Sequence, residues 1–477
     1  MGIDRSPRFA VAAMLAAVAA GCALKSPPSH DELMQDALPH AEVPPAWKAG
    51  GGSSHDVAQA WLASFNDPAL SALVAEALAY NTDLRAAAAA VEQASGYVTV
   101  ASAALLPAVN VAGISSGKAG GGGALNGIFI SASLELDIWG RVRYGQAAAR
   151  EQSAAVQADF AYARQSLAAM VAKAWFVAIE ATMQREIVLE ALQSSEALHR
   201  LAQDRLRIGN GNEQTVAEAS ANVGSFRDTL RQVELSREQA LRALELLLGR
   251  YPAGEIAVAL TLSPVPPPVP VGLPSQLLER RPDVIAAERR VAAAFDRIGE
   301  ARAAQLPRIS LTAGGSSISS DVLVLKDRNN PAWSFGGNLV APLYQGGALR
   351  AQVDIRTAEQ KQAVAAYASA GLRAFNDVEG ALSAENALRD RASVLDATVR
   401  DNERALELVR IQYRVGSADL RAVEQRQLAL YSARTTRLQV QSQQLAQRVN
   451  LYLALGGGFE SPAAETASTA SPAPPGS

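Results

Sequence analysis

"RPDVIAAERRVAAAFDRIGEARAAQLP", residues 281–307, repeats without a gap a segment that stands 200 positions earlier, "NTDLRAAAAAVEQASGYVTVASAALLP" at 81–107. Ten of the 27 positions match, and six of these pair alanine with alanine. The other matches include a proline at the end of both segments, Pro107 and Pro307. Alanine-rich runs that stop at proline are typical of helices. The chain is therefore predicted to contain two copies of one structural unit.

Later matches extend the duplication along the chain. "LRIG" at 206–209 answers "YRVG" at 413–416, at an offset of 207. A proline-rich stretch, "SPVPPPVPVGLP" at 263–274, separates the copies and is predicted to be a stiff, extended linker. We therefore place the first repeat at 61–262 and the second at 275–460.

Each repeat is predicted to contain a long helical hairpin. From Gln146 to Ile208 the chain has 63 residues without glycine or proline, about 95 Å if they are wholly helical. Apolar residues recur through this run at heptad spacing, which indicates a coiled coil, and further apolar neighbours indicate a bundle with several buried faces. The second repeat has a matching helix over 348–414, and the hairpin tips fall at about 207–214 and 414–419. The heptad positions are Val156, Phe160, Ala163, Leu167, Met170, Ala174, Val177, Ala181, Val188, Ala191, Leu198 and Ala202.

Four segments alternate between apolar and small polar residues, which predicts strands: 107–114, 128–138, 308–318 and 333–344. Strands of this length and pattern match the wall of a lipid-facing barrel, although a small soluble antiparallel sheet with one buried face shows the same alternation. Four strands cannot close a barrel, and open strand edges are not tolerated in hydrocarbon. If the strands enter a membrane, several copies must pool them, and a trimer would supply twelve.

The two ends of the chain have their own character. Residues 1–21 are predicted to be a signal peptide, because two arginines precede a 12-residue apolar core that is too short to span a bilayer. The only cysteine, Cys22, follows in "AAGCA", which indicates a bacterial lipoprotein signal whose cysteine carries a diacylglyceryl group; an ordinary secretory signal is the alternative. Residues 22–60 would then form a periplasmic anchor segment, and 461–477 has the composition of a disordered tail.

Several functional classes find no support in the sequence. A net charge of −3 gives no reason to expect nucleic acid as a partner. The four histidines lack metal-ligand spacing, and no cysteine accompanies them. "GISSG" at 113–117 fits the pattern of a nucleophile elbow, but a glycine tract follows where a helix is required. We predict no catalytic residue, no metal and no cofactor, and the protein is not expected to be an enzyme.

Four stretches resemble one known family, and the first of them along the chain is "WLASFNDPALSALVAEALAYNTDLRAAAAAVEQA" (61–94). "GLPSQLLERRPDVIAAERRVAAAFDRIGEARAAQLPRISLTAG" (272–314), "LELDIWGRVR" (134–143) and "VNLYLALGGGFE" (449–460) are similar to TolC-like outer-membrane efflux lipoproteins of the NodT type, and the likeness covers 57–460. The resemblance implies a mainly α fold, a long antiparallel coiled-coil α-barrel with four β-strands per protomer. It also implies a homotrimer with a 12-stranded β-barrel in outer-membrane lipid, and an adaptor protein and an inner-membrane resistance-nodulation-division transporter as partners.

The resemblance also assigns roles to particular residues. In the family the hairpin tips dock the adaptor and narrow the tunnel, and here they contain Arg207, Gly209, Asn210, Gly211, Arg414, Gly416 and Ser417. The glycines could equally supply the left-handed turn that a helix end needs. Relatives often carry an acidic residue facing the closed pore after the second tip. "DLRAVEQRQ" at 419–427 offers Asp419 or Glu424 as a possible periplasmic gate, with a solvated helix face as the alternative.

The function implied is that of a passive exit duct for drugs or other toxic small molecules. The outer-membrane channel of a type I protein secretion system is an alternative with the same architecture. A lipid-anchored coiled-coil scaffold, such as the adaptor itself, is an alternative of another class. Adaptors generally have one helical hairpin, however, whereas this chain is predicted to have two hairpins and amphipathic strands.

Overall fold

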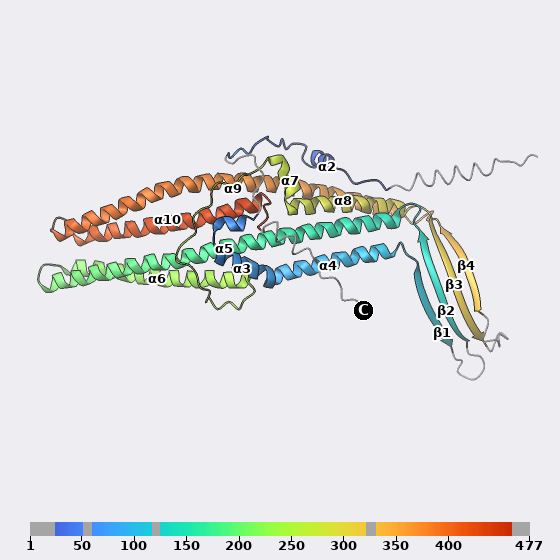
Figure 1. Ribbon diagram of the computed structural model, residues 1–477, viewed down its shortest axis with the longest axis horizontal. Coiled ribbons are helices and arrows are strands. Elements are labelled where there is room, and N and C mark those ends of the chain that lie inside the picture. Colours follow the sequence, from blue (N-terminus) through green and yellow to red (C-terminus); the bar gives the residue numbers. More distant parts are fainter. Residues whose placement is uncertain (1–23, 51–59, 117–124, 321–330, 460–477) are drawn as a thin grey trace, which may run out of the picture. The chain divides into compact units, whose positions relative to one another are not determined.

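The computed structural model describes residues 24–50, 60–116, 125–320 and 331–459. It is mostly helical, with one antiparallel sheet of four strands, so the predicted fold class is confirmed (Figure 1). The first half contains α2 (His30–Ala37), η1 (Trp61–Phe65), α3 (Pro68–Tyr80), α4 (Thr82–Ala103), β1 (Ala108–Ser116), β2 (Leu125–Leu136), α5 (Arg141–Arg207) and α6 (Glu213–Leu247). The second contains η2 (Pro274–Gln276), α7 (Leu277–Arg280), α8 (Pro282–Ala303), β3 (Arg308–Ser320), β4 (Pro331–Val340), α9 (Ala348–Arg414) and α10 (Leu420–Ala454).

Corresponding helices of the two halves have equal lengths. Helices α4 and α8 have 22 residues each, α5 and α9 have 67, and α6 and α10 have 35. Each half thus runs helix, two strands, long helix, return helix. A helix of 67 residues is about 100 Å long.

The chain divides into two compact units, and the long helices contribute residues to both. One unit, which we call the sheet unit, takes its described residues from Met1–Ala41, Ala88–Asp159 and Asp283–Gly371. It contains all four strands, α2 and nearly all of α8. The other, the tip unit, takes its described residues from Glu42–Ala87, Phe160–Pro282 and Leu372–Ser477, and contains α3, α6, α10 and both hairpin tips.

An aromatic cluster forms part of the core of the tip unit. Trp61 stacks on Tyr452 with ring centroids 5.6 Å apart, and Phe65 packs against Phe176 at 5.3 Å. These four side chains come from η1, α5 and α10 and are buried. Each buried aromatic side chain removes a large apolar area from water and so contributes strongly to the stability of the core. The cluster therefore binds the first repeat to the last helix of the second.

The predicted heptad seam of α5 is only partly buried. Leu167 and Val188 are in the core, as the spacing predicts, whereas Met170 and Val177 are exposed in the single protomer. Trp175 and Phe176, beside the seam, are buried. The helix therefore buries a face that includes these aromatic residues, in line with the several buried faces predicted, while Met170 and Val177 are open in the single protomer.

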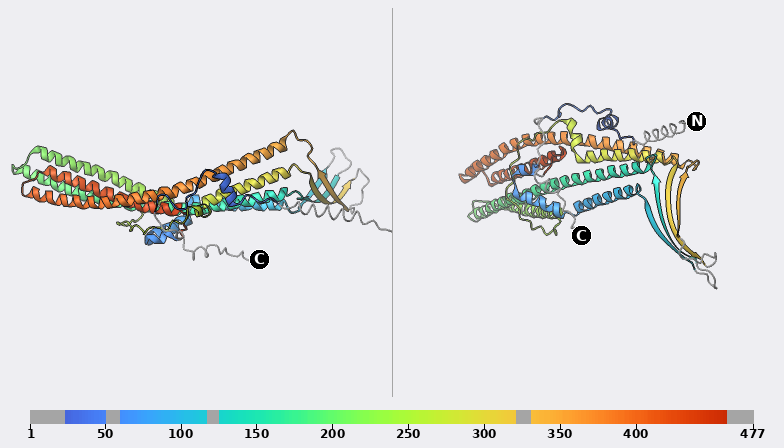
Figure 2. Two further views of the ribbon diagram at one scale, coloured as in Figure 1. Left: turned by 90° about the horizontal axis from the view of Figure 1, so that it is seen from above. Right: turned by 45° about the vertical axis from the view of Figure 1, so that its right-hand side comes forward.

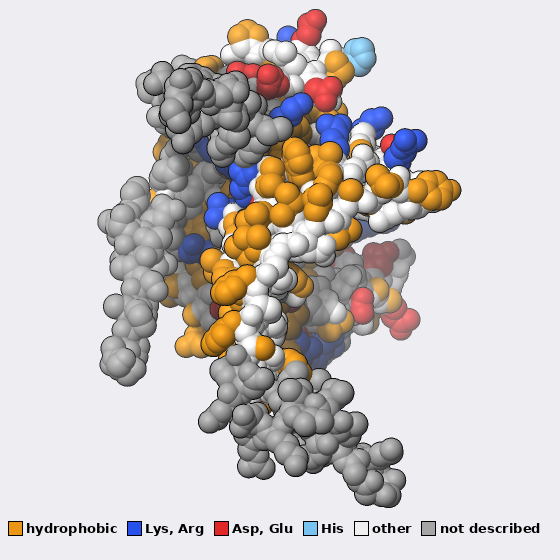
Figure 3. Space-filling view, turned by 90° about the vertical axis from the view of Figure 1, so that its right-hand side faces the viewer, with side chains coloured by type: hydrophobic (Ala, Val, Ile, Leu, Met, Phe, Trp, Pro, Cys, Tyr) orange, Lys and Arg blue, Asp and Glu red, His pale blue; other side chains and the backbone are white. Residues whose placement is uncertain are grey.

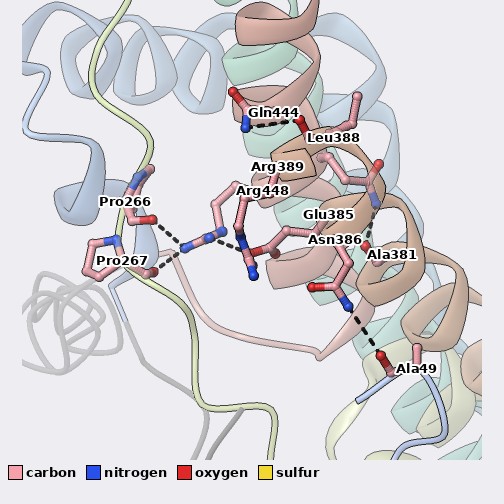
Figure 4. A network of polar contacts seen from close by, with 11 residues as sticks. Ala49, Pro266, Pro267, Ala381, Glu385, Asn386, Leu388, Arg389, Gln444 and Arg448 are labelled. Atoms are coloured by element: carbon pink, nitrogen blue, oxygen red, sulfur yellow. Dashed lines mark hydrogen bonds and ion pairs between the residues drawn. The ribbon is translucent and has the colours of Figure 1, made fainter. Parts of the chain in front are cut away.

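The proline-rich linker is bound to α9 and α10 through one arginine. Arg448 is only 3% exposed, and its Nη1 donates to the carbonyl oxygen of Pro266 at 2.8 Å and also to that of Pro267 (Figure 4). Its Nη2 donates to Oε1 of Glu385 at 2.6 Å. Proline carbonyls are free to accept because no ladder or helix uses them, so an arginine can hold an extended proline run by its backbone.

The segment before the first repeat is also fastened within the tip unit. The carboxylate of Glu379 accepts hydrogen bonds from the backbone N–H groups of Lys48 and Ala49, each at 2.8 Å. The side-chain amide of Asn386 donates to the carbonyl oxygen of Ala49 at 3.2 Å (Figure 4). Two successive N–H groups held by one carboxylate fix the direction of the chain at this point.

The sheet has the order β1-β2-β3-β4, so β1 and β4 form its two edges. The register aligns Val111, Ile130, Gly315 and Trp333 in one row across all four strands. Because successive residues of a strand face opposite sides, this row lies on an apolar face. That face carries Val109, Val111, Ile128, Ile130, Ala132, Leu134, Leu136, Ile309, Leu311, Ala313, Trp333, Phe335 and Leu339.

The opposite face of the sheet is small and polar. It carries Asn110, Ser131, Ser133, Ser310, Thr312, Ser316, Ser334 and Asn338, and among the strand residues whose side chains are described its large apolar members are Phe129 and Val340. The alternation predicted from the sequence thus survives in the register. Strand β4 ends at Val340, before Pro342, since proline cannot donate to a ladder. Leu343 and Tyr344, expected within the strand, lie beyond it and are exposed.

Candidate functional site

The tips of the two hairpins have the same turn. Gly209 and Gly416 adopt φ of 75° and 81°, the left-handed conformation that glycine allows. The turns are closed by Asn210 N–H donating to the carbonyl of Arg205 at 2.9 Å and Ser417 N–H donating to that of Gln412 at 2.8 Å. This pattern ends an α-helix by satisfying its last carbonyls. Both glycines thus have the structural role that was the alternative to adaptor contact.

The return helices begin with equivalent caps. The side chain of Asn212 accepts from the N–H of Thr215, and that of Asp419 accepts from the N–H of Ala422, both at 2.8 Å. These side chains satisfy N–H groups that the first helical turn leaves without partners. Asp419 therefore caps α10, whatever part it has in gating.

Glycine is required at position 211 because a side chain would clash with neighbouring atoms, and not because of a positive φ. A Cβ atom at this position would lie 2.8 Å from the backbone nitrogen of Leu206 and 3.0 Å from the carbonyl carbon of Arg205. No such atom fits so close to a helix backbone, so the first tip needs a residue without a side chain here. Gly211 is thus explained by the close return of the chain over the end of α5.

Each tip exposes one large aliphatic side chain. Ile208 is 72% exposed and Val415 is 74% exposed, and each directly follows a tip arginine, Arg207 or Arg414. Arg207 is exposed and pairs with Asp204 at 2.7 Å, one turn back. These aliphatic residues were not among the predicted site residues, although the repeated "RIG" and "RVG" triplets contain them. Single exposed apolar side chains are common on protein surfaces, so the notable feature here is that the same position is apolar and exposed at both tips.

The two hairpins are packed together just behind their tips, at one end of the tip unit (Figures 1 and 2). The guanidinium of Arg205 in α5 lies over the ring of Tyr413 in α9, 4.2 Å from its centroid. The side-chain amide of Gln427 in α10 donates to the carbonyl of Ala191 in α5 at 2.9 Å. The buried residues of this cluster are Ala202, Ala219, Leu406, Val409, Tyr413, Leu420, Val423 and Leu430.

Glu424 lies within this packing and is only 8% exposed. Burial raises the pKa of its carboxyl group; a hydrogen bond from Asn222 of α6 opposes that effect, and the nearby Glu218 adds to it. Among the described residues its Oε1 has no hydrogen-bond partner. A solvated helix face therefore does not describe Glu424. Asp419, by contrast, is exposed.

Metal ligation and membrane-spanning helices are two further possibilities for the described residues. No group of three or more His, Cys, Asp or Glu side chains suitable for a metal ion occurs in the part of the chain that the structure describes. Of the described helices, α5 alone has an 18-residue stretch apolar enough to cross a membrane, and 56% of that stretch is buried inside the protein. Such burial is usual for a core helix.

Comparison with known proteins bears on the role of these surfaces. The family model described as outer membrane efflux protein matches residues 73–250 and 273–457, one match for each half. The chain belongs to the outer membrane efflux protein family. The resemblance predicted from the sequence is therefore confirmed.

Two relatives illustrate the likeness in sequence. The pyoverdine export outer membrane protein OpmQ of Pseudomonas aeruginosa is 33% identical over 444 residues, which cover 88% of this chain and 92% of that protein. The cation efflux system protein CusC of Escherichia coli K12 is 31% identical over 406 residues, covering 83% and 88%. The predicted efflux role in the outer membrane is confirmed at this level, and it favours a channel over an adaptor-like scaffold.

Solved structures agree in fold. The outer-membrane channel OprN superposes with a TM-score of 0.79 at 26% identity, covering 88% of this chain and 99% of that chain. The open state of the MtrE outer membrane channel of Neisseria gonorrhoeae gives a TM-score of 0.78 at 29% identity, covering 92% and 98%. Cys22 lies outside the described residues, so its lipidation stays a prediction.

Proposed function

We propose that three copies of this chain form one channel whose sheets close a twelve-stranded barrel in the outer membrane. The observation that carries this proposal is the sheet itself: it has four strands, two open edges, and one apolar face with Val111, Trp333 and Phe335 exposed. A single sheet would leave the backbone groups of β1 and β4 without partners in hydrocarbon. Three sheets joined from edge to edge remove every open edge and turn the apolar face toward lipid.

Two neighbouring residues of β4 test the proposal. Phe335 and Ser334 lie on opposite faces of the sheet and are both exposed in the protomer. Phe335→Arg places a charge against lipid, which costs about 2–4 kcal/mol per subunit at the bilayer midplane, so we expect loss of assembled protein from outer membranes. Ser334→Arg faces the water-filled lumen and should leave assembly intact. Its single-channel conductance in planar bilayers should be lower than that of the wild type.

Three results would contradict this reading. The first is a purified wild type that runs as a single protomer without conductance. The second is equal assembly of both arginine variants. The third is a failure to assemble in the Ser334 variant alone, which would invert the two faces.

The hairpin tips are proposed to dock a periplasmic adaptor protein that links the channel to an inner-membrane resistance-nodulation-division transporter. The exposed Ile208 and Val415 support this, because each stands at a tip beside an arginine and can be covered only by another molecule. Ile208→Asp with Val415→Asp should abolish cross-linking to the adaptor and restore sensitivity to exported compounds. Arg231→Asp is a matched control, since that side chain is largely exposed on α6. Equal loss in the control would refute docking at the tips.

Glu424 is proposed as a component of the periplasmic gate, with Asp419 serving as a cap. Glu424 is buried and its Oε1 has no hydrogen-bond partner among the described residues. Both observations support a gating role, because opening of the gate would bring water to this carboxyl group. An ionised carboxylate is unfavourable in that position unless water or a cation reaches it. Conductance of Glu424→Gln and Asp419→Asn separates the two residues. A gate at Glu424 requires the first variant to change the fraction of open time and the second to leave it unaltered.

Cys22 is proposed to carry a lipid that anchors the chain to the outer membrane. The described chain begins at Leu24, and the N–H of the next residue, Lys25, donates to the hydroxyl of Tyr144 at 2.9 Å, in the first turn of α5. Lys25 thus lies at the end of α5 from which the strands extend, within the sheet unit. Mass spectrometry of the mature N-terminus should show a diacylglyceryl-modified cysteine, and Cys22→Ser should abolish it. An unmodified wild-type cysteine would disprove the anchor.

The cargo is proposed to be small toxic molecules that a pump selects, with the channel as a passive conduit that catalyses nothing. Relatives at 30–33% identity are named for export of pyoverdine, cations, antibiotics and toluene, so similarity at this level does not choose among cargoes. Export of a protein substrate is the second candidate. Deletion of the gene separates them: efflux predicts increased drug sensitivity, whereas protein secretion predicts a protein missing from the medium.

A further inference from the structure

A pocket lies where the N-terminal segment meets the first turns of α5 and the last turns of α8. It has a volume of about 290 Å³ and lies wholly within the sheet unit. Its apolar lining includes Trp139, Phe295, Ile298 and Leu306, and its polar lining includes Lys25 and Arg302. None of these residues is used by the tips or by the sheet faces.

The pocket is held in shape by an unusually close contact. A Cβ atom on Gly299 would lie 2.6 Å from the ring of Tyr144, so the ring rests directly on the backbone of α8. The hydroxyl of Tyr144 accepts the hydrogen bond from the N–H of Lys25. Gly140, with φ of 77°, leaves room for Leu24, whose Cδ2 would be 2.8 Å from a Cβ there. These contacts fix Lys25 at the edge of the pocket.

The two cationic side chains of the pocket, Lys25 and Arg302, differ from neighbouring arginines in their lack of an ion-pair partner among the described residues. Nearby, Arg141 pairs with Glu135 at 2.8 Å and Arg143 pairs with Asp137 at 3.1 Å. Lys25 and Arg302 are exposed, and within the described part of the chain neither forms an ion pair. The pocket therefore offers positive charge beside an apolar surface, and Figure 3 shows Lys and Arg side chains beside hydrophobic ones at this end.

The pocket also has a defined position relative to the strands. Leu306 comes two residues before β3 begins at Arg308, and Trp139 follows three residues after β2 ends at Leu136. The indole N–H of Trp139 donates to the carbonyl of Pro307 at 2.8 Å, which ties the two junctions together. If the apolar sheet face spans the bilayer, as proposed above, this level is the membrane–water boundary, where amphipathic rings and cations meet lipid headgroups.

From this combination we propose that the pocket binds one anionic phospholipid of the periplasmic leaflet. Its phosphate would lie between Lys25 and Arg302, and the beginning of an acyl chain would lie against Phe295, Ile298 and Leu306. Arginine and lysine are the residues that bind phosphate groups in proteins. The proposal depends on the sheet lying in the membrane.

The lipid on Cys22 is the competing occupant. Cys22 precedes Leu24 by two residues, so its Cα lies within about 7 Å of that of Leu24. A diacylglyceryl group carries no charge, however, and gives Lys25 and Arg302 no partner. The pair of free cations therefore favours a phosphate-bearing lipid over the anchor's own acyl chains.

The test measures lipid binding to the full-length protein in detergent. Dioleoylphosphatidylglycerol or dioleoylphosphatidylcholine is titrated in, and bound lipid is counted by native mass spectrometry. We expect a tight site for phosphatidylglycerol in the wild type. Lys25→Ala with Arg302→Ala should weaken it by about 30-fold, since each cation near a headgroup contributes about fivefold. Arg350→Ala is the matched control, because it lies near the start of α9, is exposed, and does not line the pocket.

Each further outcome has one meaning. Binding that survives in Cys22→Ser and in Arg350→Ala, and is lost in the double variant, supports the site. Equal binding in the double variant, or equal loss in Arg350→Ala, overturns it in favour of diffuse attraction. Binding that appears only in Cys22→Ser also overturns it, because the anchor then fills the pocket. Conductance of the same preparation is measured separately, so failure of the channel proposal is recognised independently.

Discussion

Removal of Arg448 is predicted to release the linker between the two repeats. The guanidinium is buried and bonds two linker carbonyls and Glu385, whose side chain is only 14% exposed. Arg448→Ala leaves that carboxylate with Arg389 alone, at 3.4 Å. Breaking a buried pair by removing one partner costs about 3–5 kcal/mol. If the linker opens locally, its opening equilibrium should rise by about 100- to 5000-fold.

A single thiol reports this opening. Cys22 is the only cysteine, so Val269→Cys in a Cys22→Ser background places one reporter at a buried linker position. Its labelling rate should rise by at least 100-fold when Arg448 is replaced by alanine. Arg389→Ala is the control, because its exposed side chain makes only the longer contact to Glu385, and we expect less than a tenfold change. An unchanged rate in Arg448→Ala would refute the assignment of the linker's attachment to this side chain.

Three further predictions concern charge and backbone. Burial, and then the nearby Glu151, raise the pKa of Asp296 to about 6 from 3.8, so stability should fall as pH rises from about 4 to 6; Asp296→Asn should flatten the profile of melting temperature against pH. Gly416→Ala should cost about 1–2 kcal/mol through its positive φ alone, because no atom lies within 4 Å of the added methyl group, and a fall in the melting temperature would measure it. Glu424→Ala with Gln427→Ser should lower open-channel time, because small residues at these places leave no buried polar group without a partner, and an unchanged conductance trace would exclude both from the gate.

The repeat, the hairpins and the four strands were predictable because each produces a regular recurrence in the sequence: matching segments about 200 residues apart, heptad spacing of apolar residues, and alternation of apolar and polar residues. Alternation along 128–138 fixed which face of β2 is apolar, and the register confirms it for Ile130 and Ser131. The heptad spacing does not tell which apolar positions a single protomer covers: α5 buries Trp175 and Phe176 and leaves Met170 and Val177 open. Which apolar face of α5 is buried depends on the positions of the neighbouring helices, and those positions cannot be derived from the sequence of α5 alone.

The candidate site was less predictable for a similar reason. The turn glycines and the cap at Asp419 follow from local rules, but the burial of Glu424 depends on α6, about 200 residues earlier, through Asn222 and Glu218. Ile208 and Val415 were overlooked because an apolar residue near a helix end usually packs inward. Only the structure shows that both project outward. The repeated position of the two residues was the available signal.

Divergence between the two repeats indicates where the hairpins differ in role. At the offset of 207, Glu424 and Gln427 of α10 correspond to Ala217 and Ser220 of α6. Both residues of α10 are buried, and each has a side-chain oxygen without a partner among the described residues. Buried polar groups that lack partners weaken packing, whereas small residues at the equivalent places do not. The α9–α10 hairpin therefore gains less from its buried packing and should detach at lower cost, which makes it the better candidate for the moving part of a gate.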